Sequence, residues 1–458
     1  MIARVLGNAW RRLGAAPKDD LLIRLARAST VTLFIKVGAA GLTFLMLLLI
    51  ARAMVVEDYG RFALGFSVAS FLGVAATVGF HEAILRWLPE YKAKGDAGQG
   101  RQLLYFAMQV VAGAGVAAAL ATVAIAFIVA DGAPYLLATA ILIVPLALSE
   151  YFAAALRALG SIVGALAPKD VLWRLFGVGL AGGYVLADAR LAPSTALLLM
   201  AAALGVLVAG QAYLIKVRAD AEVASVVPSA LPNERLSRGG ALRVAWPMWV
   251  SSLMINAGQH LDVVLVGLFL APEQTAAYFA ASRIAGLLSF PWVAMNVMAS
   301  PIIATLHHSG DREGLQKMLN RGVALMAVPT LIGLAIFVIG GSWILSLFNQ
   351  GFGSLQGVLI LLSISFALTA LAGPSHALMQ MTGNQTPYLK ILGVGYGVGL
   401  LVLLMLLPVI GVWAAGVGHL ISSLIRNVWI RQFALRHIQV EPTLLSLFPR
   451  ARPKLPRL

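Results

Sequence analysis

The chain has 458 residues, of which 60% are hydrophobic and only 12% charged. Its mean hydropathy is +0.88, and this excess of apolar side chains excludes a soluble globule and indicates a polytopic helical membrane protein. The absence of cysteine excludes disulfide and thiol chemistry, while the net charge of +15 has to be assigned to membrane topology before a partner is inferred from it.

Residues 1–28 mix basic and apolar side chains. No uncharged stretch with a small-residue cleavage site follows within the reach of a signal peptide, so we do not expect a removed leader. The segment is consistent with an amphipathic helix on the cytoplasmic membrane surface, broken at Pro17, and equally with a disordered basic tail.

From Ser29 onward, apolar stretches alternate with short polar breaks. A helix needs about 20 apolar residues to cross a bilayer, and most of these stretches reach that length. We therefore predict an all-α polytopic membrane protein with twelve transmembrane helices. Their residue ranges are 29–51, 62–88, 103–130, 134–158, 171–187, 193–215, 244–270, 275–302, 321–347, 355–382, 388–408 and 411–435.

The positions of the basic residues support this count. Of the 34 Lys and Arg residues, 27 lie at the two termini, in alternate loops or at the adjoining span ends, and four lie within spans. Only Arg52, Arg61 and Arg190 lie in the remaining loops. Because basic loops stay in the cytoplasm, both termini are predicted to be cytoplasmic. Most of the net charge is then a topology signal and not a nucleic-acid footprint.

An imperfect internal repeat divides the chain into two halves. Residues 55–63 align with residues 271–279 at an offset of 216, and the polar loops around Asp96 and Asp311 align at an offset of 215. Each half holds an even number of spans, so the halves share one orientation, and a substrate site is expected between them. The predicted organisation is a cytoplasmic basic segment (1–28), an N-lobe of six helices (29–215), a cytoplasmic linker (216–243), a C-lobe of six helices (244–435) and a cytoplasmic basic tail (436–458).

Enzymatic motifs are mostly absent from the sequence. No Gly-Lys dipeptide occurs, so there is no phosphate-binding loop and the chain is not expected to be an ATPase. The run from Gly393 to Gly397 resembles part of a dinucleotide fingerprint, but it lies in an apolar span, where small residues let helices approach closely. No His, Asp or Glu set has metal-ligand spacing, and no cofactor is predicted.

Ionisable residues inside the spans are the candidates for function, because a charge in the hydrocarbon core is costly unless it faces the protein interior. Arg86, Arg174 and Arg426 lie near cytoplasmic span ends and can snorkel. Glu82 is one helical turn from Arg86 and is predicted to pair with it. Lys36 lies about 10 Å inside its span. At that depth both snorkelling and a place in a cavity are open.

Asp262 and Arg283 each lie about 12 Å from the outer end of their spans. Matched depth allows them to pair, either as a purely structural ion pair or as part of a functional site. His419 shares this depth and could gain or lose a proton there. His260 lies in the same span as Asp262, and Glu150 lies deeper toward the cytoplasm without an obvious partner.

Short motifs near the ends of the spans resemble a known family. Residues 51–63, with Arg52, Glu57 and Gly60, are similar to the signature after the first span of polysaccharide-biosynthesis flippases. These are O-antigen and oligosaccharide-lipid transporters of the multidrug/oligosaccharidyl-lipid/polysaccharide (MOP) exporter superfamily. Where many members have Gly-Pro before the glutamate, this chain has Val55 and Val56.

Two further stretches carry the same resemblance. Arg86, Pro89 and Glu90 look like the family's motif after the second span, and residues from Asp262 to Arg283 look like its motif in spans seven and eight. The resemblance extends over nearly the whole chain and implies a MATE-like arrangement of two six-helix lobes.

The resemblance implies a flippase, not an enzyme, that moves an undecaprenyl-diphosphate-linked oligosaccharide from the cytoplasmic to the periplasmic leaflet of a bacterial inner membrane. An anionic diphosphate needs cations inside a cavity, for which Lys36 and Arg283, with Asp262 beside them, are the candidates. Candidates for ion or proton coupling are Asp262, Glu150, His260 and His419. Implied partners are the lipid-linked glycan, membrane lipids and the polymerase and glycosyltransferases of the same pathway, with no nucleic acid. An ion gradient, the membrane potential and substrate supply all stay open as the driving force.

Two alternatives to a flippase remain, one from the same superfamily and one from a different class of protein. An ion-coupled drug/cation antiporter of the same superfamily should have an acid-dominated cavity, whereas the interior charges here have both signs. A membrane glycosyltransferase or polymerase usually needs a sizeable outer loop to hold its saccharides, and every predicted outer loop is short.

Overall fold

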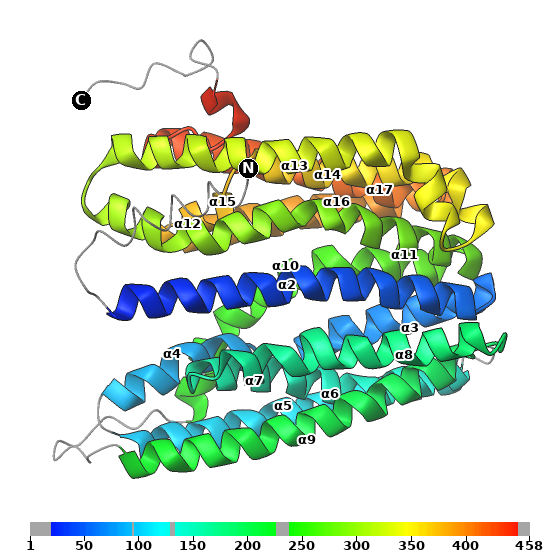
Figure 1. The fold of residues 1–458 in the computed structure, drawn as a ribbon, viewed down its shortest axis with the longest axis horizontal. Helices are drawn as coiled ribbons and strands as arrows, with labels where there is room; N and C mark the ends of the chain where they lie inside the picture. Colours follow the sequence, from blue (N-terminus) through cyan, green and yellow to red (C-terminus); the bar gives the residue numbers. More distant parts are fainter. Residues whose placement is uncertain (1–19, 94–95, 129–132, 226–237, 448–458) are drawn as a thin grey trace.

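The computed structural model describes residues 20–93, 96–128, 133–225 and 238–447, and these ranges contain helices and turns but no strand. Most helices run along the long axis of the molecule (Figure 1). Most helices of the first half (residues 20–225) form the lower layer of the view and most helices of the second half (residues 238–447) form the upper layer, while α2 lies between the layers with α10 behind it.

The first half comprises seven long helices, one short helix and a π-helical turn. They are α2 Asp20–Ala53, α3 Val56–Ala75, α4 Phe80–Ala93, α5 Ala97–Ile128, α6 Ala133–Ala158, α7 Ile162–Ala167, the π-turn η2 Pro168–Leu172, α8 Trp173–Leu186 and α9 Pro193–Ser225.

The second half repeats this pattern with more interruptions. Its helices are α10 Arg238–Phe269, α11 Pro272–Gly286, η3 Leu287–Ser289, α12 Phe290–His308, α13 Arg312–Ser346, η4 Gln350–Leu355, α14 Gln356–Leu371, α15 Ser375–Met381, α16 Gln385–Ile410, α17 Trp413–Phe433, η5 Ala434–Ile438 and η6 Leu444–Leu447.

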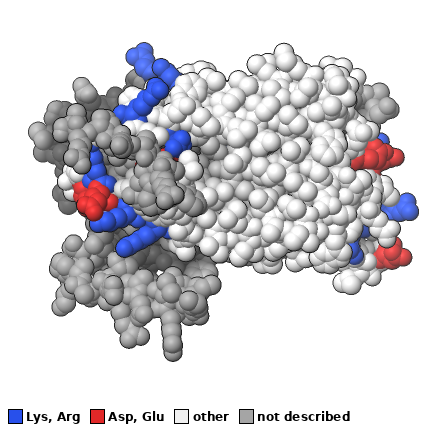
Figure 2. Space-filling view, turned by 90° about the horizontal axis from the view of Figure 1, so that it is seen from above, with Lys and Arg blue, Asp and Glu red and all other residues white. Residues whose placement is uncertain are grey.

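Seven helices of the described chain are long and apolar enough to cross a membrane, or nine if the bent α10 and the bent α11–α12 pair each form one span. Figure 2 shows a broad belt without charged residues, with Lys and Arg gathered mainly at one end. We call the end of the molecule where Lys and Arg gather the basic end, and the opposite end of the molecule the far end. The prediction of an all-helical, multi-span protein is confirmed, while the count of twelve spans and the cytoplasmic termini stay predictions.

Several helices extend beyond the predicted spans, because hydropathy marks only the apolar part of a helix. Helix α13 begins at Arg312 instead of residue 321, and α9 and α10 extend into both ends of the predicted linker 216–243. The predicted span 171–187 is preceded by α7 and η2, so the chain is already helical from Ile162. A π-turn beginning at Pro168 keeps this helix continuous, since proline has no N–H to donate.

Other predicted spans are interrupted. Helix α14 ends at Leu371 and α15 starts at Ser375, which breaks the predicted span 355–382. Span 62–88 is broken between α3 and α4, where Val78 and Gly79 both have positive φ. Hydropathy alone does not register such breaks, because the residues in them stay apolar.

The residues after α17 are packed, although the sequence predicts a basic tail there. Arg431 donates from Nε to Oε2 of Glu441 at 2.8 Å, and the Glu441 N–H donates to Oε1 of Gln316 on α13 at 2.8 Å. Glu441 and the neighbouring Val440 are buried. As far as the structure describes it, this segment ties α17 to α13. Helix α2 begins at Asp20, within the predicted N-terminal segment 1–28.

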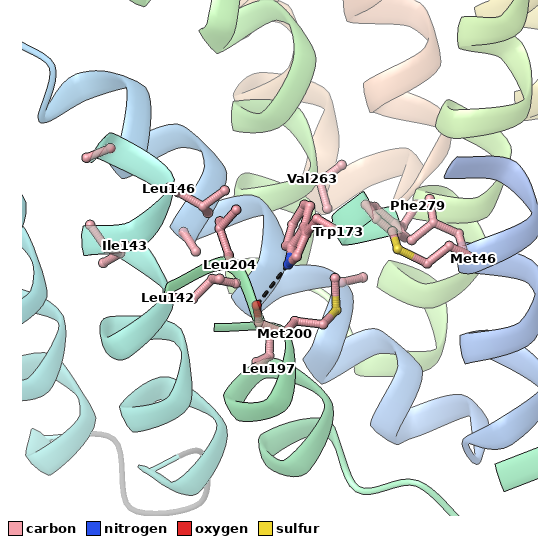
Figure 3. Close-up of a cluster of buried hydrophobic side chains, with 14 of the residues drawn as sticks. Met46, Leu142, Ile143, Leu146, Trp173, Leu197, Met200, Leu204, Val263 and Phe279 are labelled. Atoms are coloured by element: carbon pink, nitrogen blue, oxygen red, sulfur yellow. Dashed lines mark hydrogen bonds between the residues drawn. The ribbon is translucent and has the colours of Figure 1, made fainter. Parts of the chain in front are cut away.

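The core of the first half is centred on Trp173, which donates from Nε1 to the carbonyl oxygen of Met200 at 2.8 Å (Figure 3). Leucines of α6 and α9 pack around this ring, and Val263 and Phe279 of the second half reach the same cluster. The two halves therefore share one continuous apolar core along the joint between them.

The repeated motif takes the same local structure in both halves. Helices α3 and α11 follow Val55 and Ala271, which lie 216 residues apart and have nearly the same extended backbone, with φ −72° and ψ 158° against φ −61° and ψ 149°. Both helices then pack against each other at the far end. The motif thus builds the contact between the halves.

Candidate functional site

Aromatic side chains close the joint between the halves at the far end. The ring of Tyr59 on α3 lies with its centroid 6.0 Å from that of Phe279 on α11 and 6.4 Å from that of Phe352 on η4. Beside it, a Cβ on Gly60 would lie 1.9 Å from the carbonyl oxygen of Pro272, so only glycine permits this approach. The central joint is therefore closed on this side.

The motif residues Arg52 and Glu57 also lie at the far end. Arg52 donates from Nε to the carbonyl oxygen of Leu347 at 2.7 Å, in the C-terminal turn of α13, where unpaired carbonyls favour a cation. Glu57 is exposed in the first turn of α3, where a carboxylate is favourable. A cavity of about 680 Å³ opens beside Arg52 and is also lined by Asp188 and Arg190. These motif residues secure helix ends and the contact between the halves.

The second motif forms an ion pair on α4. Arg86 Nε lies 3.9 Å from Oε2 of Glu90, one turn further along, with Pro89 between them in the helix. The predicted pair of Arg86 with Glu82 is wrong. Arg86 has an acid one turn away on either side and takes the later one, while Oε1 of Glu82 lies 3.8 Å from Nε2 of His81.

Asp262 and Arg283 have separate partners. Tyr278 donates its hydroxyl to Oδ2 of Asp262 at 2.5 Å, whereas Nη2 of Arg283 donates to Nδ1 of His260 at 3.1 Å. No ion pair joins Asp262 to Arg283 within the part of the chain that the structure describes. Tyr278 and Arg283 are five residues apart, so they project about 140° apart on their helix and cannot both face Asp262.

The two polar residues of α10 point in different directions. His260 and Asp262 are two residues apart and project about 200° apart around the helix. His260 faces Arg283, while Asp262 lines a small pocket of about 40 Å³ with Tyr396 of α16 and His419 of α17. The predicted coupling candidates Asp262 and His419 thus share one pocket.

Lys169, a residue that the sequence analysis assigned to a loop, is the partner of Glu150. Its Nζ donates to Oε1 of Glu150, and the two side chains are 21% and 33% exposed. Lys169 is seven residues from the start of α7, and Glu150 is eight residues from the end of α6. Each therefore lies about 10–12 Å from the basic end, and this matched depth could have revealed the pair.

Charged residues of both halves converge where these elements meet. Helix α4 packs against both α6 and α10, and α10 packs against α11. The contacts of Arg283 with His260, of Lys169 with Glu150 and of Glu82 with His81 lie on these elements and on η2. We call this set the central charge cluster; it consists of His81 and Glu82 on α4, Glu150 on α6, Lys169 on η2, His260 on α10 and Arg283 on α11.

Arg283 keeps unused donor capacity in this cluster. Its Nε is buried and has no hydrogen-bond partner among the described residues. An unpaired buried donor is uncommon, and a guanidinium presents five donors that suit the oxygens of a phosphate. Arg283 therefore has a buried donor that suits an oxygen of an anion.

Two further expectations concern Lys36 and metals. Lys36 belongs to α2, but its side chain lies outside the described residues, so its place in a cavity stays a prediction. Among the described residues, no group of three or more His, Asp or Glu side chains is placed to hold a metal ion.

Residues 25–307 match the model of the family described as "Polysaccharide biosynthesis protein". The chain belongs to this family. The resemblance inferred from the short motifs is thereby confirmed. A curated relative of this family member, the probable flippase AglR of Haloferax volcanii, is 21% identical over 203 residues. That match covers 43% of this chain and 42% of the relative's length.

Two solved structures of membrane transporters have a similar fold. An inward-facing multidrug resistance MATE family transporter of the MOP superfamily superposes with a TM-score of 0.66 at 16% identity, covering 87% of this chain and 97% of the other. The lipid II flippase MurJ, in an inward closed conformation, gives a TM-score of 0.59 at 12% identity, with 93% and 90% covered. At these identities the likeness establishes a MATE-like fold.

Proposed function

We propose that this chain is a flippase that carries a polyprenyl-diphosphate-linked oligosaccharide from the cytoplasmic to the outer leaflet of the bacterial inner membrane. In this proposal the basic end is cytoplasmic, the twelve predicted helices span the membrane, and the halves rock about their joint in alternating access. The glycan enters the joint, while the polyprenyl tail stays in the lipid beside it.

The observation that carries the proposal is the pair of cations in the central charge cluster. Arg283 comes from the second half and contacts His260 on α10, whereas Lys169 comes from the first half and contacts Glu150 on α6. A diphosphate held between them would contact both halves at once. The unpaired buried Nε of Arg283 adds a donor for a phosphate oxygen.

The far-end closure fits one state of such a cycle. With Gly60 against Pro272 and Tyr59 among aromatic rings, the joint is sealed on the side that we propose to be periplasmic. Substrate would then enter from the cytoplasmic side. Asp262 and His419, which share a pocket on the side of α10 that faces away from His260, are the proposed coupling residues, since they can respond to an ion without competing for the phosphate.

The MATE-like fold leaves a drug/cation antiporter as the alternative. The pairing of an interior acid with a cation argues against it, because Glu150 is already paired with Lys169. A cavity for an organic cation would instead present carboxylates that no cation already neutralises.

Reconstituted flipping tests the proposal. Purified protein is placed in vesicles with an undecaprenyl-diphosphate-linked oligosaccharide that carries a fluorescent sugar, and loss of the label from one leaflet is followed with an impermeant quencher. Arg283→Gln and Lys169→Gln should each reduce flipping about tenfold to a hundredfold, because a hydrogen bond to a charged group contributes about 1.5–3 kcal/mol.

Lys317→Gln is the matched control, since Lys317 pairs with Glu313 on an exposed face of α13 and should not affect flipping. If the wild-type protein leaves the lipid in place but drives uptake of a fluorescent organic cation, the antiporter is the correct assignment.

A further inference from the structure

The ion pair of Glu150 and Lys169 lies where an ion pair is costly to maintain. Glu150 lies in the apolar helix α6, eight residues from its end, and Lys169 lies in the π-turn η2, seven residues into the helical segment that begins at Ile162. Desolvating two charges largely cancels their attraction, so such a pair contributes little to stability by itself. Its exposed fractions of 21% and 33% show that another molecule can reach it.

The π-turn places this lysine and its neighbour in separate ion pairs. Lys169 reaches Glu150, while the adjacent Asp170 accepts from Nη1 of Arg174 at 3.0 Å. Such turns widen a helix locally and are frequent at functional sites. The side chain of Lys169 therefore contacts α6 of the central charge cluster and not its own helix.

A transporter must also return across the membrane without its substrate. An unpaired lysine would then have to cross the closed, dry state of the joint, and an uncompensated buried charge opposes that step strongly. The partner that neutralises Lys169 while the carrier is empty therefore controls the return. Glu150 occupies that position in this structure.

We propose that Glu150 stands in for the substrate's phosphate on Lys169 when the carrier is empty. This inference rests on the proposed flippase function. When the diphosphate enters, it takes Lys169 together with Arg283, and the bond from Lys169 to Glu150 opens. When the glycolipid leaves, Glu150 binds Lys169 again and the empty carrier reorients with the charge of that lysine balanced.

The competition between Glu150 and the phosphate for Lys169 has a second consequence. Glu150 competes with the phosphate for Lys169 and repels it as a like charge, which weakens binding and helps release. The Glu150→Gln variant should therefore hold the lipid more tightly and turn over more slowly. If the ion pair is merely structural, Glu150→Gln should instead lower both the stability of the protein and its affinity for the lipid.

Comparison of net flipping with exchange tests this inference. Vesicles that carry the fluorescent undecaprenyl-diphosphate oligosaccharide on one leaflet only require the empty carrier to return. Vesicles with unlabelled lipid on the other leaflet permit exchange without an empty step. Glu150→Gln should lower net flipping at least about tenfold, because the return buries an unpaired lysine, while exchange, which is slowed only by the tighter binding of the lipid, should fall much less.

Glu313→Gln is the matched control, because it removes the same group from the exposed pair with Lys317 and should change neither rate. If Glu150→Gln does not fold, Glu150→Asp replaces it and should show the same split in weaker form. Loss of exchange together with net flipping in a folded variant overturns the inference, and so does unchanged net flipping. If the wild-type protein performs neither reaction, it is the proposed function that fails.

Discussion

Helices α2 and α10 begin the two halves of the predicted repeat, yet they pack in different ways. α2 packs mainly against α8 of its own half and touches α11 and α12 of the other half at only a few places. α10 bends by 52° near residue 255 and packs along α3, with further contacts to α4. Its contact with α16, the counterpart of α8, is correspondingly smaller.

Specific contacts hold α10 across the joint. Trp249 donates from Nε1 to the carbonyl oxygen of Ala75 at 2.7 Å, at the break between α3 and α4. Gly79 in that break has φ +77°, and a Cβ there would lie 2.3 Å from the carbonyl oxygen of Ala245. One side of the joint is therefore locked by α10, whereas α2 leaves the other side less constrained.

The largest effect is expected where α10 docks on the break in the first half. Gly79→Ala should lower the free energy of unfolding by about 2–5 kcal/mol, because it combines a strained left-handed backbone with a backbone clash. Chemical denaturation of the purified protein in detergent measures this change.

Gly160→Ala separates strain from clash. Gly160 also has a positive φ, +75°, but has nothing within 4 Å of the added Cβ. This control should cost only the backbone strain, about 1–2 kcal/mol. Equal losses in the two variants would mean that α10 is not locked onto the break, and the contrast between α10 and α2 would lose its basis.

A smaller effect is expected from the hydrogen bond alone. Trp249→Phe keeps an aromatic ring but removes the donor to Ala75, and it should cost about 0.5–1.5 kcal/mol. The loss is limited because the backbone N–H of Val78 also donates to that carbonyl. Trp246→Phe is the control, since Trp246 is 58% exposed and should be neutral within about 0.5 kcal/mol. If Trp249→Phe leaves the free energy of unfolding unchanged, α10 is held on the break between α3 and α4 by packing alone.

The asymmetry between α2 and α10 was not predictable from the sequence. Hydropathy and the charges of the loops predict helices and their order, and the repeat at residues 55–63 and 271–279 predicts two halves. The bend in α10 and the break before Phe80 depend on how one helix packs on another. Apolar composition is the same for a straight helix and a bent one.

For the candidate site, the sequence predicted how far each residue lies from the end of its helix, but not which side of the helix it occupies. Counting residues from a span end placed Asp262 and Arg283 at matching heights, which is correct to about one turn. Which side of its helix each residue faces depends on packing, so the partners turned out to be Tyr278 and His260. Lys169 was missed because the stretch around Pro168 has the composition of a loop.

The smallest effect on stability, with a distinct effect on transport, is expected on α2. A Cβ added to Gly41 meets no atom within 4 Å, so Gly41→Leu should change the free energy of unfolding by no more than about 0.5 kcal/mol. If the polyprenyl tail passes beside α2, where the joint is less constrained, the added isobutyl group should slow flipping several-fold. The fluorescent flipping assay and a denaturation curve on the same preparation measure both quantities.

The matched control is Gly113→Leu on α5, because Gly113 is exposed on the apolar surface of the first half and also has no atom within 4 Å of an added Cβ. It should leave both stability and flipping unchanged, since α5 packs on α6 and α4 and is far from contacts with the second half. Equal flipping rates for Gly41→Leu and Gly113→Leu would place the tail elsewhere. Slower flipping in Gly41→Leu alone would assign the less constrained side of the joint to the lipid, because the two variants add the same group to equally open helix surfaces.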